Sequence, residues 1–236
     1  MLKVNNIKKW FINQAGVAPV YLESTFKSEC VTELVHGESC LIISMVGNWV
    51  KIRTDDDYEG FVNLFYGIID FKRNNSQYYV VNPDSKGNYS AKYPFGSIVS
   101  STVEGAVKKK ERLNIDLIVP TAKKLKDIPY RWGGKSSLGF DCSGLVQAVL
   151  KVCGLDTPRD SNAQLDFFRN GTISMLNSKP GDLHFFGKEN QISHVGFSLG
   201  GEWILHSQGC VKEESIKVNK ALLEIYLLSC SIERKF

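Results

Sequence analysis

The sequence predicts an α+β domain in its C-terminal half, preceded by one or two small all-β units. Two observations predict this class. Residues 18–112 contain short apolar stretches separated by turn residues, which is typical of small barrels or sandwiches. From about residue 113 the pattern changes to helical spacing and then to further strands, which favours an α+β arrangement. A chain of 236 residues is long enough for more than one domain.

The first β unit is expected over residues 18–67, after an N-terminal arm of residues 1–17 that shows no clear pattern. In the stretch WVKIRT, apolar Val50 and Ile52 alternate with basic residues, so one face of this strand is predicted to be buried. A unit of about 50 residues buries little surface alone, so we expect it to pack on its neighbours.

A second β unit is expected over residues 68–112, where QYYVVN, a polar loop and YPFGSIVSS repeat this style. The α+β domain is expected over residues 113–236. Its clearest helix is predicted to begin at Cys142, because apolar residues recur at helical spacing through CSGLVQAVLKVC and Gly154 ends the pattern. The later stretches DLHFF, HVGFSL, WILHSQ and EIYLLSCSI are predicted strands.

The charge balance excludes some classes of partner. The formal net charge is +4 and is spread along the chain, so it does not favour nucleic acid.

No stretch approaches the roughly 20 apolar residues of a membrane helix. The apolar segment near the N-terminus is short and interrupted by Pro19, which makes it a poor signal peptide. We therefore expect a cytoplasmic protein without a membrane partner, and we favour a monomer.

Of the six cysteines, Cys142 stands apart by its position. No C-x-x-C pair is present, and without an export signal we expect free thiols. Unpaired N–H groups and the dipole at a helix N-terminus favour a thiolate, so we predict a lowered pKa for Cys142 and a nucleophilic role. The alternative is a buried cysteine that serves only packing.

A nucleophile needs a base, and His194 and His206 are the best placed candidates. They lie twelve residues apart on either side of Gly200-Gly201, which suggests neighbouring strands of a hairpin. A two-residue loop would place the two histidines on opposite faces of the sheet. A three-residue loop, or an equivalent bulge, would place them on one face, and we predict this arrangement.

The three residues then suggest a cysteine-based acyl transfer. His194 takes the Cys142 proton and later protonates the leaving amine, while His206 bonds the other ring nitrogen of His194. Backbone N–H groups at the helix start hold the oxyanion. A zinc site made by these residues with Cys210 is the competing interpretation, but its spacing fits no common zinc pattern. We expect neither a metal nor a cofactor.

Three motifs resemble those of the NlpC/p60 cysteine peptidases: PYRWGGKSSLGFDCSGLVQ, KPGDLHFF and HVGFSLG followed by ILHS. The resemblance covers residues 113–236 almost whole. It implies a papain-like α+β fold and hydrolysis of the γ-D-glutamyl bond to a diamino acid in bacterial cell-wall peptides. In the front half, HGES, GNWVKI and YEGFV resemble bacterial SH3-like modules, and YPFGSIV resembles a second copy.

The arrangement of SH3-like modules ahead of the peptidase is similar to that of enzymes that recycle murein peptides. The resemblance implies a substrate with a free N-terminal L-Ala followed by D-Glu, cut after the D-Glu. It also implies that Tyr130 lies by the oxyanion, and that Asp141 and Ser143 beside the nucleophile help to position the substrate.

The same resemblance assigns the substrate's terminal ammonium to Asp160, helped by Ser161. It further implies that Glu38 and Tyr58 of the first β unit help to close the pocket. Each residue has a structural alternative: Asp160 could cap the following helix, Glu38 could lie on the surface, and Tyr58 could pack in a strand.

We therefore expect a cysteine dipeptidyl-peptidase that acts on small murein peptides such as L-Ala-γ-D-Glu-diaminopimelate. The sequence leaves open whether the third residue is diaminopimelate or lysine. Two alternatives stay open: a hydrolase of intact peptidoglycan, and a peptidoglycan-binding module with an inactive peptidase domain.

Overall fold

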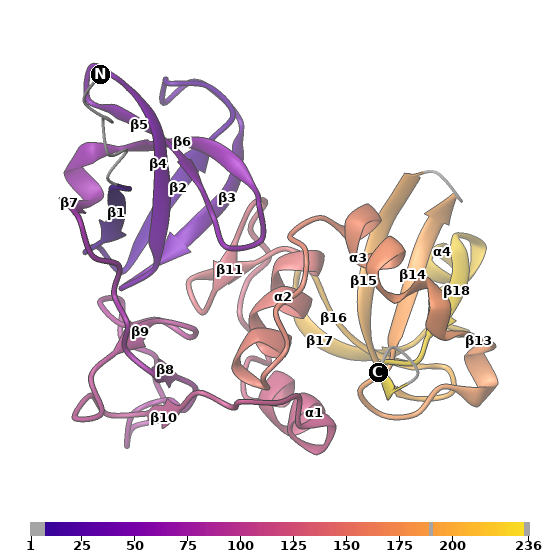
Figure 1. The fold of residues 1–236 in the computed structure, drawn as a ribbon. Coiled ribbons are helices and arrows are strands. Elements are labelled where there is room, and N and C mark those ends of the chain that lie inside the picture. Colours follow the sequence, from indigo (N-terminus) through magenta and orange to yellow (C-terminus); the bar gives the residue numbers. More distant parts are fainter. Residues whose placement is uncertain (1–7, 189–190, 234–236) are drawn as a thin grey trace.

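A computed structural model describes residues 8–188 and 191–233 (Figure 1). Figure 1 shows an all-β part in indigo and violet, a small sheet below it, and a mixed helix and sheet part in pink to yellow. Residues 1–7 of the expected arm lie outside the described residues. In the part of the chain that the structure describes, no helix is long and apolar enough to cross a membrane.

Seven antiparallel strands form what we call the front sheet, in the order β3-β2-β6-β5-β4-β1-β7. Val50 and Ile52 of β5 are fully buried, as their alternation predicts. The strands are β1 (Trp10–Asn13), β2 (Val17–Tyr21), β3 (Cys30–Val35), β4 (Ser39–Val46), β5 (Trp49–Arg53), β6 (Glu59–Asn63) and β7 (Gly67–Asp70), with a 3-10 turn at Leu64–Tyr66.

The expectation of an arm over residues 1–17 is wrong for Trp10–Asn13. This segment is β1, which pairs with β4 on one side and β7 on the other, and Phe11 is fully buried in the core of the front sheet. Four residues are too few to show a period of two, so the pattern could not reveal this strand. The front sheet therefore begins before residue 18 and continues to Asp70.

The second β unit contains three short strands, β8 (Tyr78–Val80), β9 (Ile98–Val99) and β10 (Ala106–Lys108), in the order β10-β8-β9. Its buried Tyr79 and Phe95 belong to the hydrophobic cluster of the C-terminal domain. Strands of two or three residues bury little surface, so this unit shares a core with its neighbour instead of forming one alone.

The C-terminal domain has a six-stranded antiparallel sheet in the order β13-β18-β14-β15-β16-β17. Its strands are β13 (Thr172–Ile173), β14 (Leu183–Lys188), β15 (Gln191–Gly200), β16 (Trp203–Gln208), β17 (Cys210–Ser215) and β18 (Tyr226–Cys230). Its helices are α1 (Ile118–Lys123), α2 (Cys142–Val152), α3 (Ser161–Phe168) and α4 (Lys220–Glu224), with a two-strand ribbon of β11 (Lys135–Ser136) and β12 (Gly139–Phe140). Three 3-10 turns lie at Ile115–Leu117, Arg169–Gly171 and Met175–Asn177.

Helix α2 begins at Cys142, as the sequence predicts, and packs against β15 and β16. Leu145, Val146, Val149 and Leu150 are all fully buried in the same cluster. Because α2 is buried along its length, the position of Cys142 at its first residue is set by the core of the domain.

Candidate active site

Cys142 lies at the start of α2, where a buried polar network holds the chain. Asp141 is the N-cap residue, and its carboxylate accepts from the backbone N–H groups of Gly144 at 2.6 Å and Gly133 at 2.9 Å. Buried Arg159 donates to Asp141 and to the hydroxyl of Ser143. The side chains of Asp141 and Ser143 therefore face this network. They can position a substrate only indirectly, by holding the backbone at the start of α2 in place.

Burial raises the pKa of Cys142 to about 11, and the charge of Asp141 acts in the same direction. The backbone N–H groups of Ser143 and Val195 are directed at the sulfur and act the opposite way, as does Arg159. The expected lowering of the Cys142 pKa is therefore wrong for this structure, because loss of water around a thiolate outweighs the favourable helix start. The resting side chain is a neutral thiol.

The two histidines lie together on one face of the sheet, with His194 Nε2 2.6 Å from His206 Nδ1. Strands β15 and β16 pair Phe197 with Leu205, and the register shifts by one residue between Ser198 and Gly200. This irregularity confirms the predicted bulge. Gly196 allows β15 to lie close to His206, because a Cβ atom at position 196 would lie only 2.7 Å from the Cβ of His206.

The packing of α2 on β15 places Cys142 next to the strand that carries His194. The amide directed at the sulfur belongs to Val195, the residue that follows His194 in β15. His194 and His206 are both buried, and burial lowers the pKa of His194 to about 3 and also lowers that of His206. Both imidazoles are therefore neutral at pH 7, which suits a base that must accept a proton.

Glu214 on β17 is a site residue that the sequence reasoning missed. Its Oε1 lies 2.6 Å from His206 Nε2, and it also receives Lys212 Nζ at 3.0 Å and Asn219 Nδ2 at 3.1 Å. His206 pairs with Lys212 across β16 and β17, so residue 214 is the diagonal neighbour on the same face. If the turn Gln208-Gly209-Cys210 is taken as the end of a hairpin, the resulting strand register places Glu214 next to His206.

Tyr130 lies near Cys142 and is exposed at the surface. Burial raises the pKa of Tyr130 to about 12, and a thiolate form of Cys142 and the charge of Asp141 act in the same direction. The Tyr130 backbone N–H donates to the Gly209 carbonyl at 2.8 Å, which fixes the residue next to the turn between β16 and β17. Its hydroxyl stays protonated and can donate a hydrogen bond near the sulfur.

Asp160 precedes α3 at the N-cap position, but its side chain makes no capping hydrogen bond. It interacts instead with the hydroxyl of Tyr58, in the connection that leads into β6. Burial raises the pKa of Asp160, although Arg159 and Tyr58 oppose the shift. The Ser161 hydroxyl donates to the Ile192 carbonyl at 3.1 Å, so only its oxygen lone pairs remain for a ligand.

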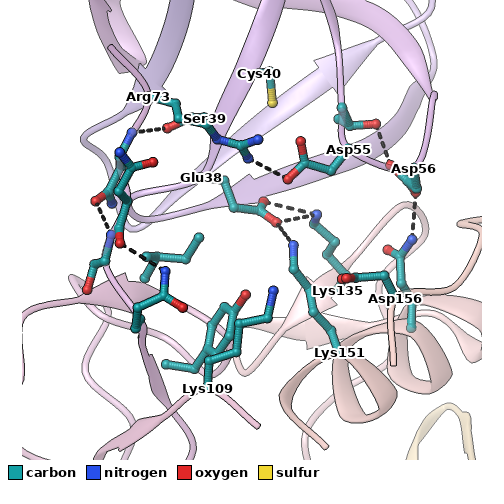
Figure 2. Close-up of a pocket in the computed structure, with 18 of the residues that line it drawn as sticks. Glu38, Ser39, Cys40, Asp55, Asp56, Arg73, Lys109, Lys135, Lys151 and Asp156 are labelled. Carbon is teal, nitrogen blue, oxygen red and sulfur yellow. Dashed lines mark hydrogen bonds and ion pairs between the residues drawn. The ribbon is translucent and has the colours of Figure 1, made fainter. Parts of the chain in front are cut away.

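Glu38 is a buried carboxylate held between two lysines. Its carboxylate lies between Lys135 Nζ at 3.0 Å and Lys151 Nζ at 2.8 Å, in a cavity of about 320 Å³ between the front sheet and α2 (Figure 2). Lys151 follows Cys142 by nine positions, or about 13 Å of helix. Burial would raise the pKa of Glu38, but the two ammonium groups lower it to about 2. The surface alternative for Glu38 is therefore wrong, because this carboxylate is buried and paired with two lysines, and its substrate-binding role stays a prediction.

Glu29 is the second carboxylate that the sequence reasoning missed. It lies just before β3 and accepts from Trp132 Nε1 at 2.9 Å. Its charge contributes to the raised pKa of Tyr58, after burial and the charge of Asp160. It follows no motif, and no signal in the sequence marks it.

Further contacts hold the front sheet against the C-terminal domain at this end of α2. They join Thr32 with Arg159 at 3.0 Å and Asp56 with Gln147 at 2.6 Å. Among the described residues, no group of three or more histidine, cysteine, aspartate or glutamate side chains is placed to hold a metal ion. The six cysteines are free thiols.

The fold and the cysteine–histidine site define the class of the C-terminal domain. Residues 127–225 match the NlpC/P60 family, and the chain carries a domain of that family.

Two relatives are named gamma-D-glutamyl-L-lysine dipeptidyl-peptidase. The chain is 35% identical over 123 residues to that of Bacillus subtilis (strain 168), covering 50% of this chain and 40% of the relative. It is 25% identical over 247 residues to the relative of Bacillus cereus (strain ATCC 10987 / NRS 248), and the match covers 84% of this chain and 73% of that relative. The crystal structure of the NlpC/p60 domain of the peptidoglycan hydrolase SagA is 33% identical, with 51% of this chain and all of that domain covered and a TM-score of 0.45.

Proposed function

We propose that this protein is a cysteine peptidase that hydrolyses the bond between γ-D-Glu and the diamino acid of murein peptides with a free N-terminal L-Ala. The observation that carries the chemistry is the placement of the Cys142 sulfur against the backbone N–H of Val195, which directly follows His194 in β15, while the His194 ring bonds His206. The names of the two Bacillus relatives support the substrate class. We further propose that the front sheet is an SH3-like module and that residues 113–236 form a papain-like peptidase domain.

The pKa values of the site suit a concerted first step. Because the thiol and the imidazole are both neutral at rest, His194 takes the proton as the sulfur attacks the carbonyl carbon. Charge then develops on the carbonyl oxygen, where the Tyr130 hydroxyl and N–H groups at the start of α2 can donate. His194 protonates the leaving amine as the C–N bond breaks, which leaves a thioester on Cys142.

Water completes the reaction. His194 accepts a proton from a water molecule while its oxygen attacks the thioester carbonyl. The C–S bond breaks, the γ-carboxyl group of D-Glu is released, and the sulfur recovers a proton from His194.

Asp160 supports the requirement for a free N-terminus. A substrate ammonium held by the Asp160 carboxylate gains a charge-assisted hydrogen bond, whereas an acylated amine carries no charge and loses that bond. Glu29 adds a second negative charge that acts on Tyr58. Tyr58 orients Asp160 from the connection that leads into β6, so a complete pocket needs both parts of the chain.

Mass spectrometry of two matched peptides tests the proposal. The protein is incubated with L-Ala-γ-D-Glu-diaminopimelate and with the same peptide carrying an N-acetyl group, and Cys142→Ala is the control. We expect the free peptide to be cut after D-Glu and the acetylated one to remain intact. Equal cleavage of both would overturn the ammonium pocket, and cleavage of neither would overturn the peptidase assignment.

A further inference from the structure

Glu214 has no part in the reaction as described above, although it lies directly behind His206. We propose that Glu214 is a positioning residue that selects the tautomers of both histidines, so that Nδ1 of His194 carries the lone pair that accepts the Cys142 proton. This inference rests on the proposed function for its catalytic meaning. The tautomers themselves can be measured without a substrate.

The first step is that Glu214 can only accept a hydrogen bond from His206. Three groups face this carboxylate: His206 from β16, Lys212 on its own strand, and Asn219 from the segment before α4. Lys212 and Asn219 donate hydrogen bonds to this carboxylate. Burial raises the pKa of Glu214, but the hydrogen bonds from Lys212, Asn219 and His206 together outweigh it, so the pKa is lowered. An ionised carboxylate has no proton to give.

The second step follows along the row of rings. Because Glu214 accepts at 2.6 Å, Nε2 of His206 carries its hydrogen, and in a neutral imidazole Nδ1 then carries a lone pair. That lone pair faces Nε2 of His194 at 2.6 Å, so His194 Nε2 must donate. His194 is neutral as well, which leaves its Nδ1 as the unprotonated nitrogen.

The alternative network shows why the carboxylate matters. Two neutral imidazoles in contact can also bond in the reverse sense, with His206 Nδ1 donating to His194 Nε2. His194 Nδ1 would then carry a hydrogen and could not take a proton from Cys142. A fixed negative charge at Nε2 of His206 disfavours this reverse network, and the charge of Glu214 also favours the protonated form of His194 that the reaction requires.

A purely structural role for Glu214 is the competing interpretation. Asn219 both caps α4, through the N–H of Leu222 at 3.2 Å, and donates to Glu214. Loss of the carboxylate could therefore loosen the segment before α4 without any effect on tautomers. The experiment must separate these roles.

Glu214→Gln is the informative variant, because it keeps the shape but can present either an oxygen or an NH₂ group to His206. Glu214→Asp retains the charge. Glu213→Gln is the matched control: the neighbouring side chain pairs with Lys123 on the surface and takes no part in the site.

Nitrogen-15 NMR of labelled histidine side chains reads the tautomers in the free protein. We expect the wild type and Glu213→Gln to show His194 with hydrogen on Nε2 alone. Glu214→Gln should show a mixture of tautomers or the reverse form. A single unchanged His194 tautomer in Glu214→Gln would overturn the proposal.

Alkylation of Cys142 by iodoacetamide, followed by peptide mass spectrometry, supplies the functional readout without a murein peptide. We expect Glu214→Gln to lower the alkylation rate at pH 7 by at least about tenfold. At alkaline pH the rate should still rise as in the wild type, because the thiol then ionises without the help of a base. Glu214→Asp should recover part of the rate, and Glu213→Gln should match the wild type. Equal rates in Glu214→Gln and Glu213→Gln would refute a role in proton transfer.

Kinetics on the murein peptide then separate this inference from the proposed function. We expect Glu214→Gln to lower kcat by about a hundredfold with little change in KM. If the wild type cuts no such peptide, the proposed function fails, while the NMR and alkylation results still decide the role of Glu214.

Discussion

The carboxylate of Asp160 interacts with the hydroxyl of Tyr58, which directly precedes β6, and it makes no capping hydrogen bond to α3, the helix that it precedes. An aspartate at an N-cap position usually accepts from the next turn of its own helix. Here the side chain turns toward the other part of the chain. Its charge is therefore available to a ligand at the boundary between the two parts.

Replacement of this carboxylate should affect binding and leave the fold intact. We expect Asp160→Asn to lower kcat/KM for L-Ala-γ-D-Glu-diaminopimelate by about 10- to 100-fold, because a charge-assisted hydrogen bond is worth about 1.5–3 kcal/mol. The melting temperature should stay close to that of the wild type, since no capping bond is lost. Steady-state kinetics and thermal unfolding check both expectations. A large fall in stability with unchanged kcat/KM per folded protein would favour the capping role.

Removal of the nucleophile should abolish turnover without unfolding the protein. Cys142 lies at the first residue of α2, whose capping contacts come from Asp141 and not from the sulfur. We expect Cys142→Ala to show no cleavage in a mass-spectrometric assay and a circular dichroism spectrum like that of the wild type. Residual turnover at the wild-type rate would contradict a covalent role for this cysteine.

The acid limb of the pH–rate profile should lie below the ordinary range of histidine. Burial lowers the pKa of His194 to about 3 from 6.5, so this base stays unprotonated well below neutral pH. The pKa of Asp160 is raised by burial, and its protonation also weakens substrate binding as the pH falls. We expect kcat, measured at saturating peptide, to remain near its maximum at pH 5.5. A midpoint near 6.5 would contradict a buried neutral His194.

Glu38 should govern the stability of the contact between the front sheet and α2. Its pKa is lowered from 4.5 to about 2, so its charge contributes stability at pH values above about 4.5, and this contribution is lost as the pH falls toward 2. The difference corresponds to about 3 kcal/mol. We expect Glu38→Gln to be less stable than the wild type at pH 7, and the two proteins to converge near pH 2.

Denaturant unfolding at a series of pH values measures this difference. Lys51 and Glu59, which form an ion pair on the surface of the front sheet, provide the control. We expect Glu59→Gln, which removes the ion pairs of Glu59 with Lys51 and Arg53, to change stability far less than Glu38→Gln at any pH, because these pairs lie at the surface and are screened by solvent. Equal effects of Glu38→Gln and Glu59→Gln would show that the buried pair contributes no more than a surface one.

Sequence patterns within single helices and hairpins predicted where the candidate site residues lie along the chain. Helical spacing placed the start of α2 at Cys142, and alternation identified the buried face of β5. The requirement that His194 and His206 share a face predicted an irregular register before the structure showed it. Each of these inferences uses neighbours along one helix or one hairpin, where the backbone period alone dictates which side chains meet.

The tertiary structure decided what depends on distant segments. It placed Glu38 between two lysines, brought Tyr58 to Asp160, and set Glu214 behind His206. It also reversed the expected shift in the pKa of Cys142. Burial and long-range contact arise only when the front sheet, α2 and the C-terminal sheet pack together, so the period of a single strand or helix carries no information about them.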